Sequence, residues 1–384
     1  MKKFSLISLV SFLFISPLFA HAQATIIQDK AEVVKAQVVH ITKEENRIIP
    51  GTDTPGTFQT IQAKILEGTQ TGKVVTFTDD YLNLAKGEIF YLNHTTEGQS
   101  GIEMYGEMDV YRIPTILLFT FIFVALVLLI GGIQGLRGLL SLIGSLLLIT
   151  FVLLPGILHG YPPVLVSIAV SSVIIVLGSY ITHGFNKTTS SAVLGMIITV
   201  LFTAGLAFWA VHMGKFTGQG SDEAVYLILN SRGHIDVIGI LLGGIMIGVL
   251  GVLYDVSIGQ AISVEELHHI APHIPRSKIY TRAIRIGREH IGALVNTLAI
   301  AYVGASLPLL LLFYQTDSSI SQVMSREVFA SEIIRTLVGS IGLVMAVPIT
   351  TFLAVIMLVK VQKTNDTEVI HKEAEALKHA EHHH

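Results

Sequence analysis

Seven apolar segments, each long enough to cross a lipid bilayer, follow one another along most of the chain. A spanning helix needs about 20 consecutive apolar residues, because its backbone groups must pair internally across hydrocarbon about 30 Å thick. The segments are 114–134, 138–155, 162–182, 190–212, 236–254, 290–313 and 335–360. Only 14% of the residues are charged, against about 25% in soluble domains. We therefore predict a membrane all-α bundle of seven transmembrane helices over residues 113–360, embedded in a lipid bilayer.

The first 22 residues have the pattern of a secretory signal. Lys2 and Lys3 precede an apolar stretch, and Ala20 and Ala22 form a small-residue cleavage pattern. We predict a signal peptide over residues 1–22. An uncleaved anchor is the competing interpretation, and both place the next segment outside the cytoplasm.

Residues 23–112 have the alternation of short β-strands. Ile61, Ala63 and Ile65 alternate with Gln62 and Lys64, and turn sequences such as "PGTDTPG" and "EGTQTGK" separate the apolar runs. Five or six such strands predict a small all-β, barrel-like extracytoplasmic domain. It is either a spacer that packs on the membrane part or a domain that binds an extracytoplasmic protein partner. Because the chain contains no cysteine, disulfides and thiolate chemistry are excluded.

The distribution of lysine and arginine predicts the orientation. With the β domain outside, the segments assigned to the cytoplasm carry eleven lysines and arginines. The outer loops carry four, which are Lys215, Arg232, Arg326 and Arg335. This excess follows the positive-inside rule. An odd number of spans then places the tail, residues 361–384, in the cytoplasm.

Glycine and proline predict how the helices pack and bend. Gly239 and Gly243 are four residues apart in the fifth span, as are Gly244 and Gly248, so two faces of that helix allow close approach of neighbouring backbones. Pro308 in the sixth span and Pro348 in the seventh each remove a backbone hydrogen bond, and a kink is expected at both.

The polar residues at the end of the fifth span form the first half of a candidate site. Asp255 directly follows an eighteen-residue run without charge, and Ser257 and Gln260 follow it at capping-box spacing. One interpretation is a break in the helix at the cytoplasmic interface, capped by these side chains. The other is an ionisable group reached from the cytoplasm, since a carboxylate at the end of a span must be hydrated, paired with another group or part of a functional site.

The sixth span contributes the second half. It opens with Glu289 and His290 and places Asn296 and Thr297 in its apolar interior. Asn296 needs a hydrogen-bond partner there, which another helix or Asp255 could supply if the fifth and sixth spans are neighbours. We therefore predict a polar site, for transport or for structure, between these two spans.

Three arginines precede the sixth span at three-residue spacing. Arg282, Arg285 and Arg288 fall on one helix face. They are interpreted as residues that bind lipid headgroups and set the topology, because each such cation near anionic lipid contributes about 1 kcal/mol of attraction. Substrate binding is the alternative.

Several other functions are disfavoured by the sequence. His268, His269 and His273 lie near Glu265, but Pro272 interrupts their helix, so we predict no metal site. No P-loop, nucleophile elbow or H-E-x-x-H motif is found, and no basic and aromatic pattern indicates nucleic acid. We expect no cofactor and no enzymatic activity.

Two stretches resemble the paired signature of the YibE/F-like family of bacterial multi-pass membrane proteins. They are "GVLGVLYDVSIGQAISVEEL" and "YTRAIRIGREHIGALVNTLAIAYVGASLPLLLLF". The positions that match the family pattern are Asp255, Gln260, Ala261, Arg285, Gly287, Arg288, Asn296, Thr297, Tyr302, Gly304, Ser306 and Pro308. Two positions depart from it: a small residue is commoner at Ile262, and an acidic or smaller residue is often found at Tyr254. The resemblance implies a multi-pass protein of the bacterial plasma membrane and carries no biochemical activity with it.

Two functions follow from these patterns. The first is a permease for an ion or small molecule, with Asp255, Gln260, Glu289, His290, Asn296 and Thr297 forming its polar site. The second is a membrane-anchored scaffold whose exported β domain binds a partner. An intramembrane enzyme ranks third, because no nucleophile and base stand together in the sequence.

Overall fold

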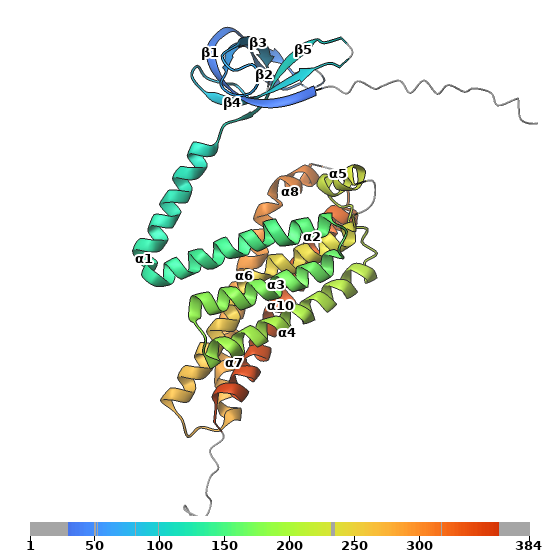
Figure 1. Cartoon of the computed structure of the whole chain (residues 1–384). Helices are drawn as coiled ribbons and strands as arrows, with labels where there is room; N and C mark the ends of the chain where they lie inside the picture. The colour runs from blue at the N-terminus through green and yellow to red at the C-terminus, as the bar shows by residue number, and fades with distance from the viewer. Residues whose placement is uncertain are drawn as a thin grey trace, which may run out of the picture. The chain divides into compact units, whose positions relative to one another are not determined.

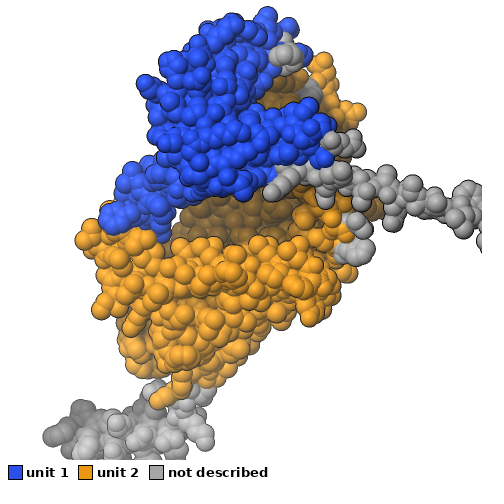
Figure 2. Space-filling view, turned by 45° about the horizontal axis from the view of Figure 1, so that its top comes forward, with its two compact units in different colours: residues 1–123 blue, residues 124–384 orange. Residues whose placement is uncertain are grey.

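The computed structural model describes residues 30–49, 51, 53–80, 82–98, 100–231, 235–315 and 317–360. The predicted signal peptide, residues 1–22, and the predicted tail, residues 361–384, lie outside the described residues. The chain forms two compact units, residues 1–123 and 124–384, which are coloured separately in Figure 2. Each unit is described by itself.

The N-terminal unit contains one five-stranded antiparallel sheet in the order β3-β2-β1-β4-β5 (Figure 1). The strands are β1 (Lys30–Ile48), β2 (Pro55–Ile65), β3 (Val74–Asp79), β4 (Ile89–Thr96) and β5 (Glu103–Val110). The register between β1 and β2 shifts between Val38 and His40 and again between Ile41 and Lys43. Such bulges bend a strand and increase its twist, and this long central strand therefore curls the sheet into half of a barrel.

The concave face of the sheet holds an apolar core. Ile61, Ala63 and Ile65 are buried, which confirms the alternation predicted for that stretch. Phe77 and Phe90 meet over them with ring centroids 5.6 Å apart. Burial of these side chains supplies the main stabilising free energy of a domain that has no disulfide to restrain it.

A polar cluster joins the two edges of the sheet. Lys73, next to β3, donates from Nζ to Glu103 Oε2 at 2.7 Å and to Tyr105 Oη at 2.9 Å, both on β5. The hydrogen bonds from Lys73 and Tyr105 lower the pKa of the Glu103 carboxyl from 4.5 to about 2. The cluster therefore helps to close the half-barrel through a carboxylate that is ionised at neutral pH.

The helices account for the rest of the described chain. α1 (Ile113–Leu148) begins in the first unit and passes through a π-helical turn, η1 (Ile149–Leu153), into α2 (Leu154–Leu158). The following elements are α3 (Pro163–His183), α4 (Lys187–Met213), α5 (Asp222–Asn230), α6 (Val237–Ile270), α7 (Arg276–Ala305), α8 (Leu307–Tyr314), α9 (Ile320–Ser325) and α10 (Glu327–Leu358). Figure 1 shows α3, α4, α6 and α10 running side by side as a bundle.

Five helices in the described residues are long and apolar enough to cross a membrane, and the count becomes six if α7 and α8 form one broken span. The first two predicted spans fall within a single helical stretch, Ile113–Leu158. That stretch is kinked at Gly132, where φ is 54° and ψ is −136°. Only glycine adopts this conformation without strain.

The two prolines behave differently. Pro308 lies in the first turn of α8, and α7 and α8 meet there at 64°, so the predicted kink is confirmed and is a full break. Pro348 lies inside α10, which is assigned as one helix from Glu327 to Leu358. The missing amide of Pro348 therefore does not end the helix.

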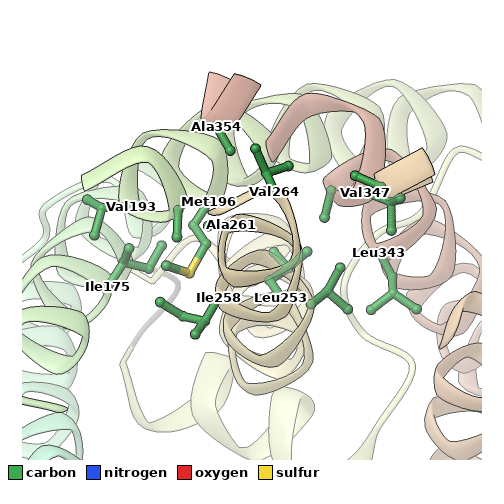
Figure 3. Close-up of a cluster of buried hydrophobic side chains, with 14 of the residues drawn as sticks. Ile175, Val193, Met196, Leu253, Ile258, Ala261, Val264, Leu343, Val347 and Ala354 are labelled. Atoms are coloured by element: carbon green, nitrogen blue, oxygen red, sulfur yellow. The ribbon is translucent and has the colours of Figure 1, made fainter. Parts of the chain in front are cut away.

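The core of the bundle lies between α3, α4, α6 and α10. Figure 3 shows Ile175, Met196, Leu253 and Leu343 from these four helices among the buried side chains. Glycine and small hydroxyl residues bring the helix backbones together. A Cβ added at Gly195 would lie closer than 3.0 Å to Thr350, and one added at Gly342 closer than 3.0 Å to Thr203.

The close approach predicted at the glycine faces of α6 is confirmed at Gly239, Gly243 and Gly248, whereas Gly244 has only Arg335 Nη2 of α10 near it, at 4.0 Å from an added Cβ. A Cβ at Gly239 would meet Pro163 at 3.0 Å, and one at Gly243 would lie under 3.0 Å from Ser167, so this face packs on α3. A Cβ at Gly248 would lie under 3.0 Å from the Tyr302 hydroxyl of α7. The two faces therefore receive two different helices, as their spacing predicts.

Candidate functional site

α6 passes straight through Asp255, which overturns one of the two interpretations of that residue. The helix continues from Val237 to Ile270, so Asp255 does not cap a break at a membrane interface. Ser257 and Gln260, the predicted capping residues, lie within the helix as well. Ser263, one turn further on, donates from Oγ to Gly259 O at 2.8 Å. The capping-box spacing is coincidental here, because small and polar residues also suit a helix that packs closely.

Asp255 opens onto a cavity of about 260 Å³ between α6 and α7. Gln260 and His290, two other predicted site residues, line the same cavity. The remaining lining residues are Val256, Gly259, Ser263, Ile291, Leu294 and Val347. The structure therefore brings one carboxylate, one imidazole and one amide from the two predicted spans to a single space.

Gln260 connects three helices at the base of this cavity. It is buried, and its Oε1 accepts a hydrogen bond from Thr351 Oγ1 of α10 at 2.9 Å. One turn away, Thr350 Oγ1 donates to Ser257 Oγ at 3.2 Å. A Cβ added at Gly287 of α7 would lie 2.5 Å from Gln260 Nε2, so α7 can approach only because that residue is glycine. The amide of Gln260 is held in place by its surroundings.

Asp255 and His290 are the chemically active groups of the cavity. Among the residues that the structure describes, no basic side chain pairs with Asp255. Both residues are exposed, and both line the cavity. A carboxylate and an imidazole that line one cavity can together bind a small cation, because carboxylate oxygens and imidazole nitrogens both serve as acceptors or ligands.

The other three predicted residues lie elsewhere. Glu289, Asn296 and Thr297 are exposed and do not line this cavity. Thr297 Oγ1 donates to Ala293 O in its own helix at 2.9 Å. In the described part of the chain, the structure shows no hydrogen bond between Asn296 and Asp255, although the sequence suggested one.

The three arginines are exposed on α7. Arg282, Arg285 and Arg288 form no ion pair with any residue that the structure describes. Their binding to lipid headgroups stays a prediction. A different arginine, Arg276, holds the helix ends together: its Nε donates to Val359 O at 2.9 Å and satisfies a carbonyl at the end of α10.

A second polar cavity, which the sequence did not predict, lies between α5, α6, α8 and α10. It measures about 760 Å³ and contains Glu332 and Arg335, whose Oε1 and Nη1 are 3.0 Å apart. The one sequence feature that could have indicated this pair is the three-residue spacing of Glu332 and Arg335, which places both side chains on one face of a helix. The sequence predicts that the seventh span begins at residue 335, whereas α10 begins at Glu327. Arg335 therefore lies inside the helix and not in an outer loop.

A third cavity, of about 580 Å³, lies on the other side of α8. Its lining is mainly apolar and includes Tyr302, Phe313 and Phe329, and it shares Glu332 with the second cavity. α8 has no buried residue. The short helix that follows the break at Ser306 therefore stands between two cavities.

Comparison with known proteins identifies the family of the chain. Neither a curated protein nor a solved structure matches it. A family model described as YibE/F-like protein matches residues 119–360, which extend from α1 to the end of α10 and include both cavities lined by α6. The chain therefore belongs to the YibE/F-like family, and its apolar helices are those of a membrane protein.

Proposed function

We propose that this protein is a permease for a small ion or solute. The observation that carries the proposal is the cavity between α6 and α7, which Asp255, His290 and Gln260 line together. An ionisable residue within a membrane helix is costly, and such residues commonly mark the path of an ion or substrate. Asp255 has no cationic partner among the described residues, so it is available to a ligand.

We propose transport in preference to catalysis because of the groups that the cavity offers. Ser263 is its one hydroxyl among the described lining residues, and its Oγ is bonded to the carbonyl of Gly259. No activated nucleophile is therefore formed with His290. A carboxylate beside an imidazole in a glycine-rich bundle suits reversible binding and release.

We further propose seven membrane crossings. The two arms of α1 on either side of Gly132 would form two spans, and α7 with α8 would form one broken span. Together with α3, α4, α6 and α10 they make seven. The excess of cytoplasmic lysine and arginine then supports an exported β domain, a cytoplasmic C-terminus and a location in the bacterial plasma membrane.

Reconstitution tests the permease directly. The full chain is placed in proteoliposomes, and uptake of protons, Na⁺, Mn²⁺ and a panel of small organic solutes is followed with trapped indicators and labelled compounds. Asp255→Asn and His290→Gln each remove an ionisable group that lines the cavity, and we expect each to reduce uptake on the order of tenfold or more. Glu289→Gln is the matched control, because Glu289 is next to His290 and lies outside the lining. Wild-type uptake of every compound by Asp255→Asn and His290→Gln would refute the proposal.

The β domain favours a second candidate function, as a scaffold. β5 is an edge strand, and Met104 and Met108 on it are 53% and 58% exposed, beside Ile102 at 57%. An edge strand with exposed apolar side chains can add a strand from another protein. Under this alternative, Met104→Lys and Met108→Lys abolish the cellular phenotype, whereas Asp255→Asn leaves it intact. The opposite pattern would exclude the scaffold.

A further inference from the structure

Residues on one side of α6 line both polar cavities. Gly244 lines the cavity of about 760 Å³, and Asp255 and Gly259 line the cavity of about 260 Å³. At 100° per residue, Gly244, Gly248, Gly251, Asp255 and Gly259 fall within one narrow sector of the helix. A Cβ added at Gly251 or Gly259 would meet no atom within 4 Å. Both positions therefore have space for a side chain, and Gly259 lines the Asp255 cavity.

A side chain of α7 packs on this face between Gly244 and Asp255. Tyr302 of α7 is half-buried, and its hydroxyl is seated so closely on Gly248 that a Cβ there would lie under 3.0 Å from it. Gly248 is about 6 Å from Gly244 and about 10 Å from Asp255 along the helix axis. The contact therefore lies between the two spaces, four residues before the break at Ser306 where α7 ends and α8 begins.

The charges around both cavities favour a cation. The larger cavity is lined by four carboxylates, those of Asp222, Glu223, Glu327 and Glu332, and by one guanidinium, that of Arg335. Arg335 neutralises Glu332, and Glu327 accepts hydrogen bonds from Thr217 and Gly218. Hydrogen bonds from its own backbone amide and from Ser221 lower the pKa of Glu223, which keeps this carboxylate ionised. The smaller cavity adds Asp255.

We propose that the two cavities are the opposite entrances of one cation pathway along α6 and that Tyr302, seated on Gly248, is its barrier. This inference rests on the proposed permease function and adds the substrate class and the closing residue. The cavity of Glu332 and Arg335 receives the cation on one side of the membrane. The cavity of Asp255 and His290 receives it on the other.

Thiol labelling tests the barrier without reference to transport, because the chain contains no cysteine. In sealed vesicles containing the full chain, a membrane-impermeant maleimide is applied from each side. Ser277→Cys and Ser325→Cys serve as references for the two surfaces, since both serines are exposed and line neither polar cavity. We expect Gly244→Cys to label from the side of Ser325→Cys and Gly251→Cys from the side of Ser277→Cys. Both glycines leave room for a side chain.

Tyr302→Ala then removes the barrier. We expect labelling of Gly251→Cys from the opposite side to rise on the order of tenfold, whereas Tyr314→Ala, at an exposed tyrosine of α8, leaves it unchanged. Labelling of both cysteines from one side, labelling of neither, or unchanged sidedness in Tyr302→Ala would overturn the proposal. If Tyr302→Ala does not fold, the proposal is still tested by the sides of the membrane from which Gly244→Cys and Gly251→Cys are labelled.

Ion flux separates this inference from the function on which it rests. In the same vesicles, indicators for H⁺, Na⁺ and Mn²⁺ report cations and lucigenin reports chloride. We expect cation flux that Asp255→Asn abolishes and no chloride flux. Flux that depends on Asp255 but is unaffected by Tyr302→Ala refutes the barrier and leaves the permease. If Gly244→Cys and Gly251→Cys are labelled from opposite sides but no cation or solute moves, the permease and the cation assignment are refuted. The barrier between the cavities would then still stand.

Discussion

Gly342→Ala should destabilise the bundle through one identifiable contact between α4 and α10. The new Cβ would lie closer than 3.0 Å to Thr203 Oγ1, 3.3 Å from Thr203 Cγ2 and 3.4 Å from Thr203 Cβ. Thr203 is buried, and its hydroxyl donates to Thr199 O at 2.8 Å in its own helix. Both partners therefore sit on rigid backbone, and the helices must separate by several tenths of an ångström.

The magnitude follows from the cost of overpacking. An extra methyl group in a packed interior costs about 1–3 kcal/mol. Thr203→Ala removes Oγ1 and Cγ2 and leaves only the ordinary contact to Cβ. In the wild-type background that change loses a hydrogen bond of about 0.6 kcal/mol, the average in membrane helices. The double variant should therefore be about as stable as Thr203→Ala alone, with a coupling free energy of about 1–3 kcal/mol.

The assay is unfolding of the full chain in mixed micelles by titration with dodecyl sulfate, followed by far-ultraviolet circular dichroism. Gly205→Ala, also on α4, is the control, because a Cβ there meets no atom within 4 Å. If Gly342→Ala costs no more than Gly205→Ala, or if Thr203→Ala does not rescue it, the proposed packing of α4 on α10 is wrong.

Three further predictions concern the bend in α1, the junction at Gln260 and the β domain. Gly132→Ala should destabilise the fold by about 1–3 kcal/mol, because alanine is strained at φ 54° and ψ −136°. The same dodecyl sulfate titration measures this loss of stability, and Gly131→Ala at the neighbouring position is the control. Equal losses of stability in the two variants would contradict the prediction. Gln260→Leu should cost only about 0.6 kcal/mol, because the single proton of the Thr351 hydroxyl has a second acceptor, Val347 O at 2.6 Å, to which it can be donated instead. A loss several times larger would mean that the amide does more than join helices. Because the folded-state pKa of Glu103 is lowered to about 2 from 4.5, its stabilisation is present above the unfolded value and is lost as the pH falls through the folded one. Amide hydrogen exchange in β5 should therefore be faster in Lys73→Met than in wild type at neutral pH. This difference should shrink as the pH falls towards about 2. The control Lys64→Met should exchange at the wild-type rate.

Much of the local structure could be predicted from the sequence, because hydrophobic spacing alone decides it. The alternation of Ile61, Ala63 and Ile65 identified a strand, and long apolar runs identified the helices. The glycine pairs of α6 identified the two faces that meet α3 and α7. In each case the signal repeats with the period of the backbone, so it can be read without knowing what lies opposite.

The site was predictable only in part. Asp255, Gln260 and His290 were identified because polar groups are conspicuous in apolar helices, and tertiary structure placed them in one cavity. The same argument failed for Asn296 and Thr297, because helical position decides which neighbour a side chain faces, and these two residues are exposed and do not line the cavity. The role of Thr351 as the partner of Gln260 could not be inferred, since a threonine in an apolar helix looks the same whether it bonds its own backbone or another helix.

Sequence by itself determined the apolar helices, the β domain and the glycine faces, because these depend on composition and period within one segment. Only the tertiary structure decided that α6 continues through Asp255, that Glu332 and Arg335 lie in a cavity, and that Tyr302 closes on Gly248. The last two features join residues far apart in the chain: Gly248 and Tyr302 are 54 positions apart, and Gly218 and Arg335, which line the same cavity, are 117 positions apart. The physical reason is that a helix carries its own hydrogen bonds, whereas the choice of neighbour depends on the shape and charge of every other helix in the bundle.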